Sequence, residues 1–169
     1  MELMLQLYQA RKYSYETLFA GASIFDRYVA LVGIQNISKN DVTLLAVTCL
    51  LIGAKLEQPN YPNFNNMIYA LEDVNGDIVK REDLIHLEQK IMRQFAFDFN
   101  FVGPKQFLDR YMRILELENK SKIQKMALQI LSLSIVNHKL ISYRPSQIAA
   151  CSLIIALNIY TAQKHIKKE

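Results

Sequence analysis

The sequence is poor in residues that interrupt helices and in residues that build disulfide or metal scaffolds. Its 169 residues include five Gly, four Pro, two Cys, three His and no Trp. So few Gly and Pro residues argue against a fold rich in strands and tight turns. The two cysteines have no second Cys or His at ligand spacing, so we expect neither a disulfide framework nor a metal site. Nothing in the sequence calls for a cofactor.

Long apolar runs are scarce as well. The run from Leu44 to Ala54 is shorter than the roughly 20 residues that a membrane-spanning helix needs. The first residues, Met1 to Leu7, are apolar but have no basic lead. We therefore expect a chain that does not bind a membrane and that resides in the cytoplasm, the nucleus or both.

Charge of neither sign dominates. Twenty Lys and Arg residues face sixteen Asp and Glu residues, which gives a net charge of +4. The cations are spread along the chain, and their one dense cluster is the terminal stretch 164–168. A nucleic-acid-binding surface needs clustered cations. We therefore do not expect a nucleic acid partner.

No combination of side chains resembles an active site. The three histidines, His86, His138 and His165, each stand alone. The sequence has no Gly-rich phosphate loop, no pair of histidines on one helix turn and no nucleophile motif. An interaction protein is therefore the expected class, rather than an enzyme.

Helix-forming residues and apolar spacing predict an all-α fold with eight helical segments. Ser14 is placed to cap the second segment, Pro104 to open the sixth, and Ser121 to Gln124 matches a capping box for the seventh. The expected segments are 2–11, 14–33, 38–58, 64–71, 80–95, one opening at Pro104, 121–138 and one opening at Pro145.

The segment from Asp41 to Lys55 is apolar nearly all round and should be central. The segment from Pro145 to Tyr160 should be central too, because its small residues allow other helices to approach closely. Each follows a peripheral pair of helices, so the pattern repeats loosely. The second repeat stops after its central helix. A surface of Ile148, Leu153 and Ile155 without a cover would favour association with a partner.

Lys55 and Glu88 are charged residues set in apolar helical stretches. A charge beside a core helix costs free energy unless it is paired, solvated or reserved for a partner. The two side chains could pair with each other, serve a partner, or do both, because the free protein can hold the pair ready for binding.

Several motifs, in their joint order, resemble those of the cyclin family. Gly53-Ala54-Lys55-Leu56-Glu57-Gln58 is similar to the Ala-Ser-Lys-aromatic-Glu-Glu of its third helix. The other matching stretches are Ile24 to Val29, Leu87-Glu88, Phe97-Asp98-Phe99, Phe107-Leu108 and Tyr143 to Ala150.

The resemblance implies tandem cyclin-like helical folds, the second incomplete, with an N-terminal cyclin box at 1–102 and a partial C-terminal fold at 103–169. It implies an activating subunit of a cyclin-dependent protein kinase. In the family, the Lys and Glu that match Lys55 and Glu88 reach the kinase near its C helix. The implied partner-binding groove comprises Ile52, Lys55, Leu56, Glu57, Glu88, Met92, Phe97 and Phe99.

Two other functions stay open at this point. A cyclin-fold protein can serve as a structural subunit of a larger assembly without binding a kinase, and the unfinished second repeat favours another protein that covers it. A cyclin fold can also contact DNA as a transcription factor, although the diffuse charge speaks against this.

Overall fold

The computed structural model describes residues 1–76 and 78–166, apart from the side chains at 39, 40, 75 and 164–166, so the terminal cation cluster lies outside the described side chains. The described part contains helices and no strand, which confirms the all-α class and all eight expected segments. The helices are α1 Glu2–Arg11, α2 Tyr15–Val32, α3 Lys39–Glu57, α4 Phe64–Asn75, α5 Arg81–Gln94, α6 Pro104–Ile114, α7 Ser121–Ser134 and α8 Pro145–Ile166, with short 3₁₀ helices η1 Ile34–Asn36 and η2 His138–Leu140.

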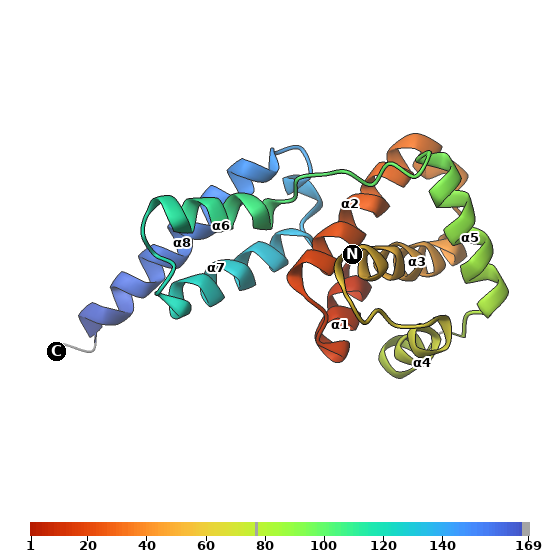
Figure 1. Ribbon diagram of the computed structural model, residues 1–169, viewed down its shortest axis with the longest axis horizontal. Helices are drawn as coiled ribbons and strands as arrows, with labels where there is room; N and C mark the ends of the chain where they lie inside the picture. Colours follow the sequence, from red (N-terminus) through yellow and green to blue (C-terminus); the bar gives the residue numbers. More distant parts are fainter. Residues whose placement is uncertain (77, 167–169) are drawn as a thin grey trace. The chain divides into compact units, whose positions relative to one another are not determined.

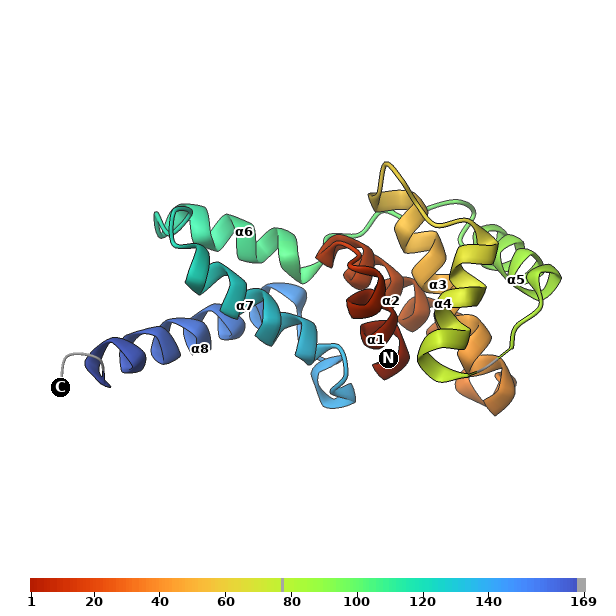
Figure 2. The same cartoon turned by 90° about the horizontal axis from the view of Figure 1, so that it is seen from below.

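The chain divides into two compact units, Met1–Phe101 and Val102–Glu169. The boundary lies one residue before the one expected from the sequence. Figure 1 shows α1 to α5 of the first unit and α6 to α8 of the second, and Figure 2 shows the same helices turned by 90°.

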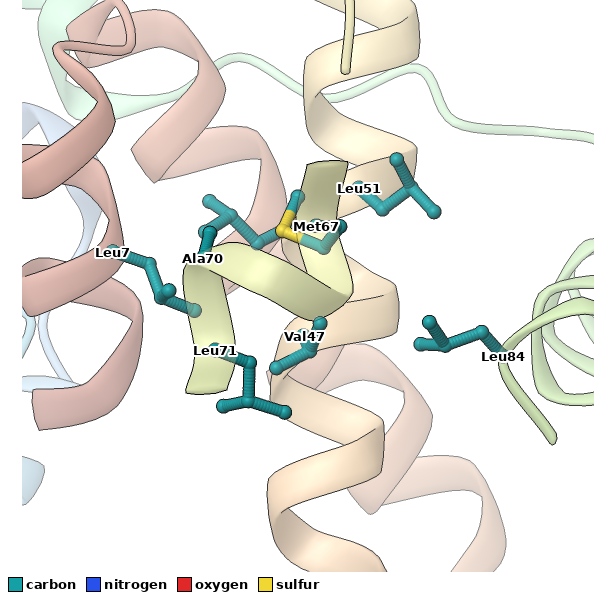
Figure 3. Close-up of a cluster of buried hydrophobic side chains, with 8 residues drawn as sticks. Leu7, Val47, Leu51, Met67, Ala70, Leu71 and Leu84 are labelled. Carbon is teal, nitrogen blue, oxygen red and sulfur yellow. The ribbon is translucent and has the colours of Figure 1, made fainter. Parts of the chain in front are cut away.

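The first unit is built around α3, which packs against α1, α2, α4 and α5. Every residue from Leu45 to Ala54 is buried, so the prediction that this helix is central is confirmed. Figure 3 shows side chains of α1, α4 and α5 around those of α3. The buried cluster consists of Leu7, Val47, Leu50, Leu51, Met67, Ala70, Leu71 and Leu84.

Two glycines let α2 and α3 approach until their backbones touch. A Cβ atom on Gly53 would lie 2.8 Å from both the amide nitrogen of Gly21 and the carbonyl oxygen of Thr17. A Cβ atom on Gly21 would lie 3.0 Å from the Cα atom of Leu50. Real Cβ atoms do not come that close to backbone, so this crossing requires small residues on both helices.

Two of the predicted helix starts are confirmed by the structure and one is not. The Oγ atom of Ser14 accepts a hydrogen bond from the Thr17 amide at 3.2 Å, and Pro104 is the first residue of α6. The predicted capping box at Ser121 is wrong, because Lys120 precedes α7 and no side chain caps it. A turn in which the Lys120 amide donates to the Leu117 carbonyl at 2.9 Å sets that start instead.

Helix α7 ends at Ser134, four residues before the expected end. The hydroxyls of Ser132 and Ser134 donate to carbonyls three residues earlier, at 2.8 and 2.6 Å. The Asn137 side chain then accepts a hydrogen bond from the Lys139 amide at 3.1 Å and begins η2. Short polar side chains that bond the local backbone compete with the helix in this way.

In the second unit, α8 packs on both α6 and α7. The packed side holds Ala149, Ser152, Leu153 and Ala156, while Ile154 and Ile155 are exposed. Helix α8 is thus central to its unit, as expected, and α6 and α7 cover only one side of it. Leu153, expected on the uncovered surface, is only 3% exposed.

One helix of the described part, α8, is long and apolar enough by length and composition to cross a membrane, over Pro145–Gln163. Core helices of globular proteins pass the same test, so it is weak evidence for a membrane. In this stretch only 22% is buried inside the protein. An apolar helix with so much exposed surface calls for a functional explanation.

Candidate partner-binding surface

Lys55 and Glu88 meet between the last turn of α3 and the middle of α5. The Lys55 Nζ atom lies 2.7 Å from Oε1 and 2.9 Å from Oε2 of Glu88. The side chains are 26% and 9% exposed, respectively. Of the interpretations left open by the sequence, the structure therefore shows the one in which the two charges pair.

The surroundings of the pair fix the position of the ammonium group. Lys55 Nζ lies 4.6 Å from the ring centroid of Phe64 at the start of α4. An ammonium group has three N–H donors, so two of them suffice for the two oxygens of the Glu88 carboxylate. The third is left for the ring face of Phe64 or for an acceptor on a partner.

The other side chains expected in the groove on α3 and α5 differ in exposure. Leu56 is 48% exposed, Glu57 is exposed and Met92 is half-buried. Ile52 is only 1% exposed and lies in the core. Leu56, the residue after Lys55, thus offers apolar surface at the end of α3, whereas Ile52 is part of the core and offers none.

The segment after α5 presents Phe97 to solvent in an unusual backbone conformation. Ala96 and Phe97 have φ values of 48° and 61°, and Phe97 is 70% exposed. The left-handed region is sparsely populated by residues other than Gly, and such outliers concentrate at functional sites. Hydrogen bonds from the Phe97 amide to the Met92 carbonyl at 3.0 Å and from Asp98 to Phe95 at 2.9 Å hold the turn.

The side chain of Arg27 on α2 holds the segment after α5 in place. Its guanidinium lies 4.4 Å from the ring centroid of Phe95, and Nη1 donates to the Asp98 carbonyl at 3.2 Å. The Phe95 ring in turn packs against Phe99, with centroids 5.6 Å apart. Sequence reasoning missed Arg27, because no spacing rule links residues so far apart in the chain.

The surface combines exposed apolar side chains with one partly buried pair of opposite charges. A protein partner can bind groups of these kinds. Within the described residues no cluster of three or more His, Cys, Asp or Glu side chains could hold a metal ion.

Comparison with known proteins shows the family. The model of the cyclin N-terminal domain matches residues 1–100, and that of the cyclin C-terminal domain matches residues 102–168. The chain belongs to the cyclin family. The resemblance expected from the motifs is confirmed, including tandem cyclin folds of which the second has three α-helices in the described part.

Individual relatives are distant in sequence. The chain is 28% identical over 148 residues to cyclin-B2-2 from Oryza sativa subsp. indica, covering 88% of this chain and 32% of that protein. It is 28% identical over 144 residues to G2/mitotic-specific cyclin-4 from Saccharomyces cerevisiae, covering 85% of this chain and 29% of that protein. A viral cyclin from herpesvirus saimiri has a similar fold, with a TM-score of 0.80 and 18% identity, covering 91% of this chain and 65% of that one.

The chain thus spans about a third of the length of these curated relatives. The name of the Saccharomyces cerevisiae relative describes a G2/mitotic-specific cyclin. The present chain is accordingly a cyclin-like protein.

Proposed function

We propose that the protein binds and activates a cyclin-dependent protein kinase in the cytoplasm or the nucleus. The surface around the ends of α3 and α5 holds the C helix of that kinase. The observation that carries this proposal is the partly buried ion pair of Lys55 and Glu88, which joins α3 to α5 in a unit that also exposes the apolar side chains of Leu56 and Phe97.

The chemistry of the surface matches a helix end. The terminal turns of a helix leave backbone amides and carbonyls without partners inside the helix. Lys55 can donate to such a carbonyl, and Glu88 can accept from such an amide. Exposed Leu56 and Phe97 supply apolar area for the flank of such a helix.

Activation would follow from position alone. Efficient phosphoryl transfer by a protein kinase requires an ion pair between a Lys of the kinase and a Glu of its C helix. A partner that binds only the inward position of the C helix shifts the population toward that position. The cyclin-like chain contributes no group to the reaction itself.

The test is kinase association and activity with the double variant Lys55→Ala/Glu88→Ala. Truncating buried charges at an interface costs roughly 2–5 kcal/mol, so association with a panel of purified cyclin-dependent kinases should be lost. The control is Arg11→Ala/Asp73→Ala, which removes an ion pair of 2.9 Å on the exposed surface of the same unit.

Helical circular dichroism should be unchanged in both variants. If the Lys55/Glu88 variant is folded and still activates its kinase normally, the assignment of this surface is wrong. Loss of binding in the Arg11/Asp73 control as well would mean that the effect is not local.

A second candidate function rests on the exposed side of α8. The protein would then be a structural subunit of a larger assembly and would not bind a kinase. Exposed Ile154, Ile155 and Ile159 favour some protein partner on the second unit. If a stable complex without a kinase forms and no kinase binds, this candidate replaces the first.

A further inference from the structure

The second unit carries a groove that the kinase-binding surface does not use. It lies between the end of α7 and the first turns of α8 and has a volume of about 530 Å³. Leu133 and Ile155 on its rim are 61% and 46% exposed. Its lining consists of Ile130, Leu133, Ser134, Asn137, Leu140, Tyr143, Gln147, Ile148, Cys151, Ser152 and Ile155.

Several polar groups in this groove are already engaged in hydrogen bonds within the chain. The hydroxyl of Ser134 donates to the Leu131 carbonyl at 2.6 Å, and that of Ser152 to the Ile148 carbonyl at 2.8 Å. The Gln147 side-chain oxygen accepts from the Arg144 amide at 3.1 Å. The floor therefore offers mainly apolar surface, and an occupant would need apolar side chains to fill it.

The charge of the second unit indicates which residues should flank the apolar side chains of an occupant. The first unit has nine Lys and Arg residues and twelve Asp and Glu residues, whereas Val102–Glu169 has eleven and four. Residues 119–168 contain eight Lys and Arg residues and no Asp or Glu. A basic partner would find no carboxylate on α7 or α8, but an acidic one would find cations.

These cations lie along the approaches to the groove. Lys122 precedes Ile130 by eight residues on α7, and Lys125 precedes Leu133 by the same spacing, so each lies on the same helix face as a lining residue. Lys139 and Arg144 flank the lining residues Leu140 and Tyr143 at the other end. All four residues are exposed.

We propose that the α7–α8 groove binds an amphipathic helix of another protein, with an apolar stripe flanked by Asp and Glu residues. A ridge of side chains fits a groove between two helices, which is the usual way in which amphipathic helices are recognised. A lipid bilayer fits a convex apolar face better than a groove. This interface is separate from the kinase surface and does not rest on the proposed kinase function.

The test uses the full chain and a displayed library of random peptides of about 16 residues, which is four to five helix turns. Peptides bound by the chain should be acidic and should repeat apolar residues at helical spacing. The double variant Leu133→Gln/Ile155→Gln should weaken each peptide by at least about tenfold. Ile114→Gln is the matched control, because Ile114 is 64% exposed on α6 and does not line the groove.

A second readout places the peptide on the groove itself. Cys151 lines the groove and is exposed, whereas Cys49 is buried in α3. Bound peptide should slow the alkylation of Cys151 in proportion to occupancy and leave Cys49 unaffected. The affinity of the chain for the peptide should also fall as the salt concentration rises from about 50 to about 300 mM. The variant Lys122→Glu/Lys125→Glu should bind the peptide more weakly than the wild type does.

Several results would overturn the proposal. They are selection of basic or non-amphipathic peptides, no selection above background, equal binding by the Leu133/Ile155 variant, and binding that leaves Cys151 reactive. Binding of anionic phospholipid vesicles that depends on Leu133 and Ile155 would assign the face to a membrane instead. Self-association through the same residues in sedimentation would assign it to a second copy. None of these experiments involves a kinase, so a failure of the groove proposal would not affect the kinase proposal.

Discussion

Glu88 and Asp26 are carboxylates on two helices of the same unit, and they differ in whether a cation pairs with them. Glu88 lies within hydrogen-bonding distance of Lys55 and is nearly buried. Asp26 on α2 is half-buried and, among the described residues, has no hydrogen bond or ion pair. A paired charge is tolerated because attraction offsets desolvation, whereas for Asp26 the loss of solvation outweighs the attraction of the Met1 amino group.

We predict that Asp26→Asn stabilises the protein near neutral pH. Burial raises the pKa of Asp26, although the positive charge of the Met1 amino group counteracts this in part. A carboxyl whose pKa is raised on folding favours the native state below its unfolded pKa of about 3.9, and this contribution is lost as pH rises through the folded pKa. The asparagine variant should therefore gain in Tm over the wild type at about pH 7.

The gain should disappear at about pH 3, where Asp26 is protonated in both states. The control is Glu72→Gln on α4, an exposed carboxylate that should show no such pH-dependent gain. A melting temperature of Asp26→Asn that exceeds the wild type equally at both pH values would mean that ionisation is not the cause.

At the scale of elements, the contact between α2 and α3 determines where the ion pair lies. Gly53 is two residues before Lys55, and its Cα faces the backbone of Gly21. The separation of the two helices therefore influences the position of the last turn of α3, which carries the site. Sequence reasoning found α3 but gave no reason for a glycine inside it.

We predict that Gly53→Ala destabilises the first unit although Ala is the better helix former. The added Cβ atom would lie 2.8 Å from two backbone atoms, which cannot move as a flexible side chain can. Overpacking costs about 1–3 kcal/mol, which exceeds the roughly 1 kcal/mol that Ala gains over Gly in a helix. Denaturant unfolding monitored by circular dichroism measures the net effect.

Gly21→Ala is the graded comparison, because its nearest contact is 3.0 Å and its cost should be smaller. Unchanged or higher stability of Gly53→Ala would show that α2 and α3 separate without loss.

The helices were predictable from sequence because periodic apolar residues and caps such as Ser14 act locally. The end of α7 was not predictable from sequence, because there the hydroxyls of Ser132 and Ser134 donate to backbone carbonyls of the helix. Hydrogen bonds from side chains to the backbone leave no periodic signal in the sequence. The exposed Phe97 depends on a turn whose left-handed residues are not glycine. The resemblance placed Lys55 and Glu88 in one groove, and their pairing was one of the alternatives left open by the sequence, so the contact of Nζ with both carboxylate oxygens required the structure.

At the scale of the whole molecule, two units with different charge carry two different surfaces. The first unit is acidic overall and bears the Lys55–Glu88 pair. The second is basic and bears the apolar groove of α7 and α8. Surfaces of such different chemistry favour two partners of different kinds. The protein would thus link a kinase bound to its first unit with an acidic helix bound to its second.

The central claim, that the first unit holds the C helix of a kinase, is tested most directly by photo-crosslinking. The variant Leu56→p-benzoylphenylalanine places a crosslinker at a position that is 48% exposed and directly follows Lys55. Mass spectrometry of its adducts with a cyclin-dependent kinase should identify peptides from the kinase C helix. The same crosslinker at Leu133, on the second unit, should give no adduct with that helix. Capture of the C helix from Leu133 and not from Leu56, or no kinase adduct from either position, would contradict the account.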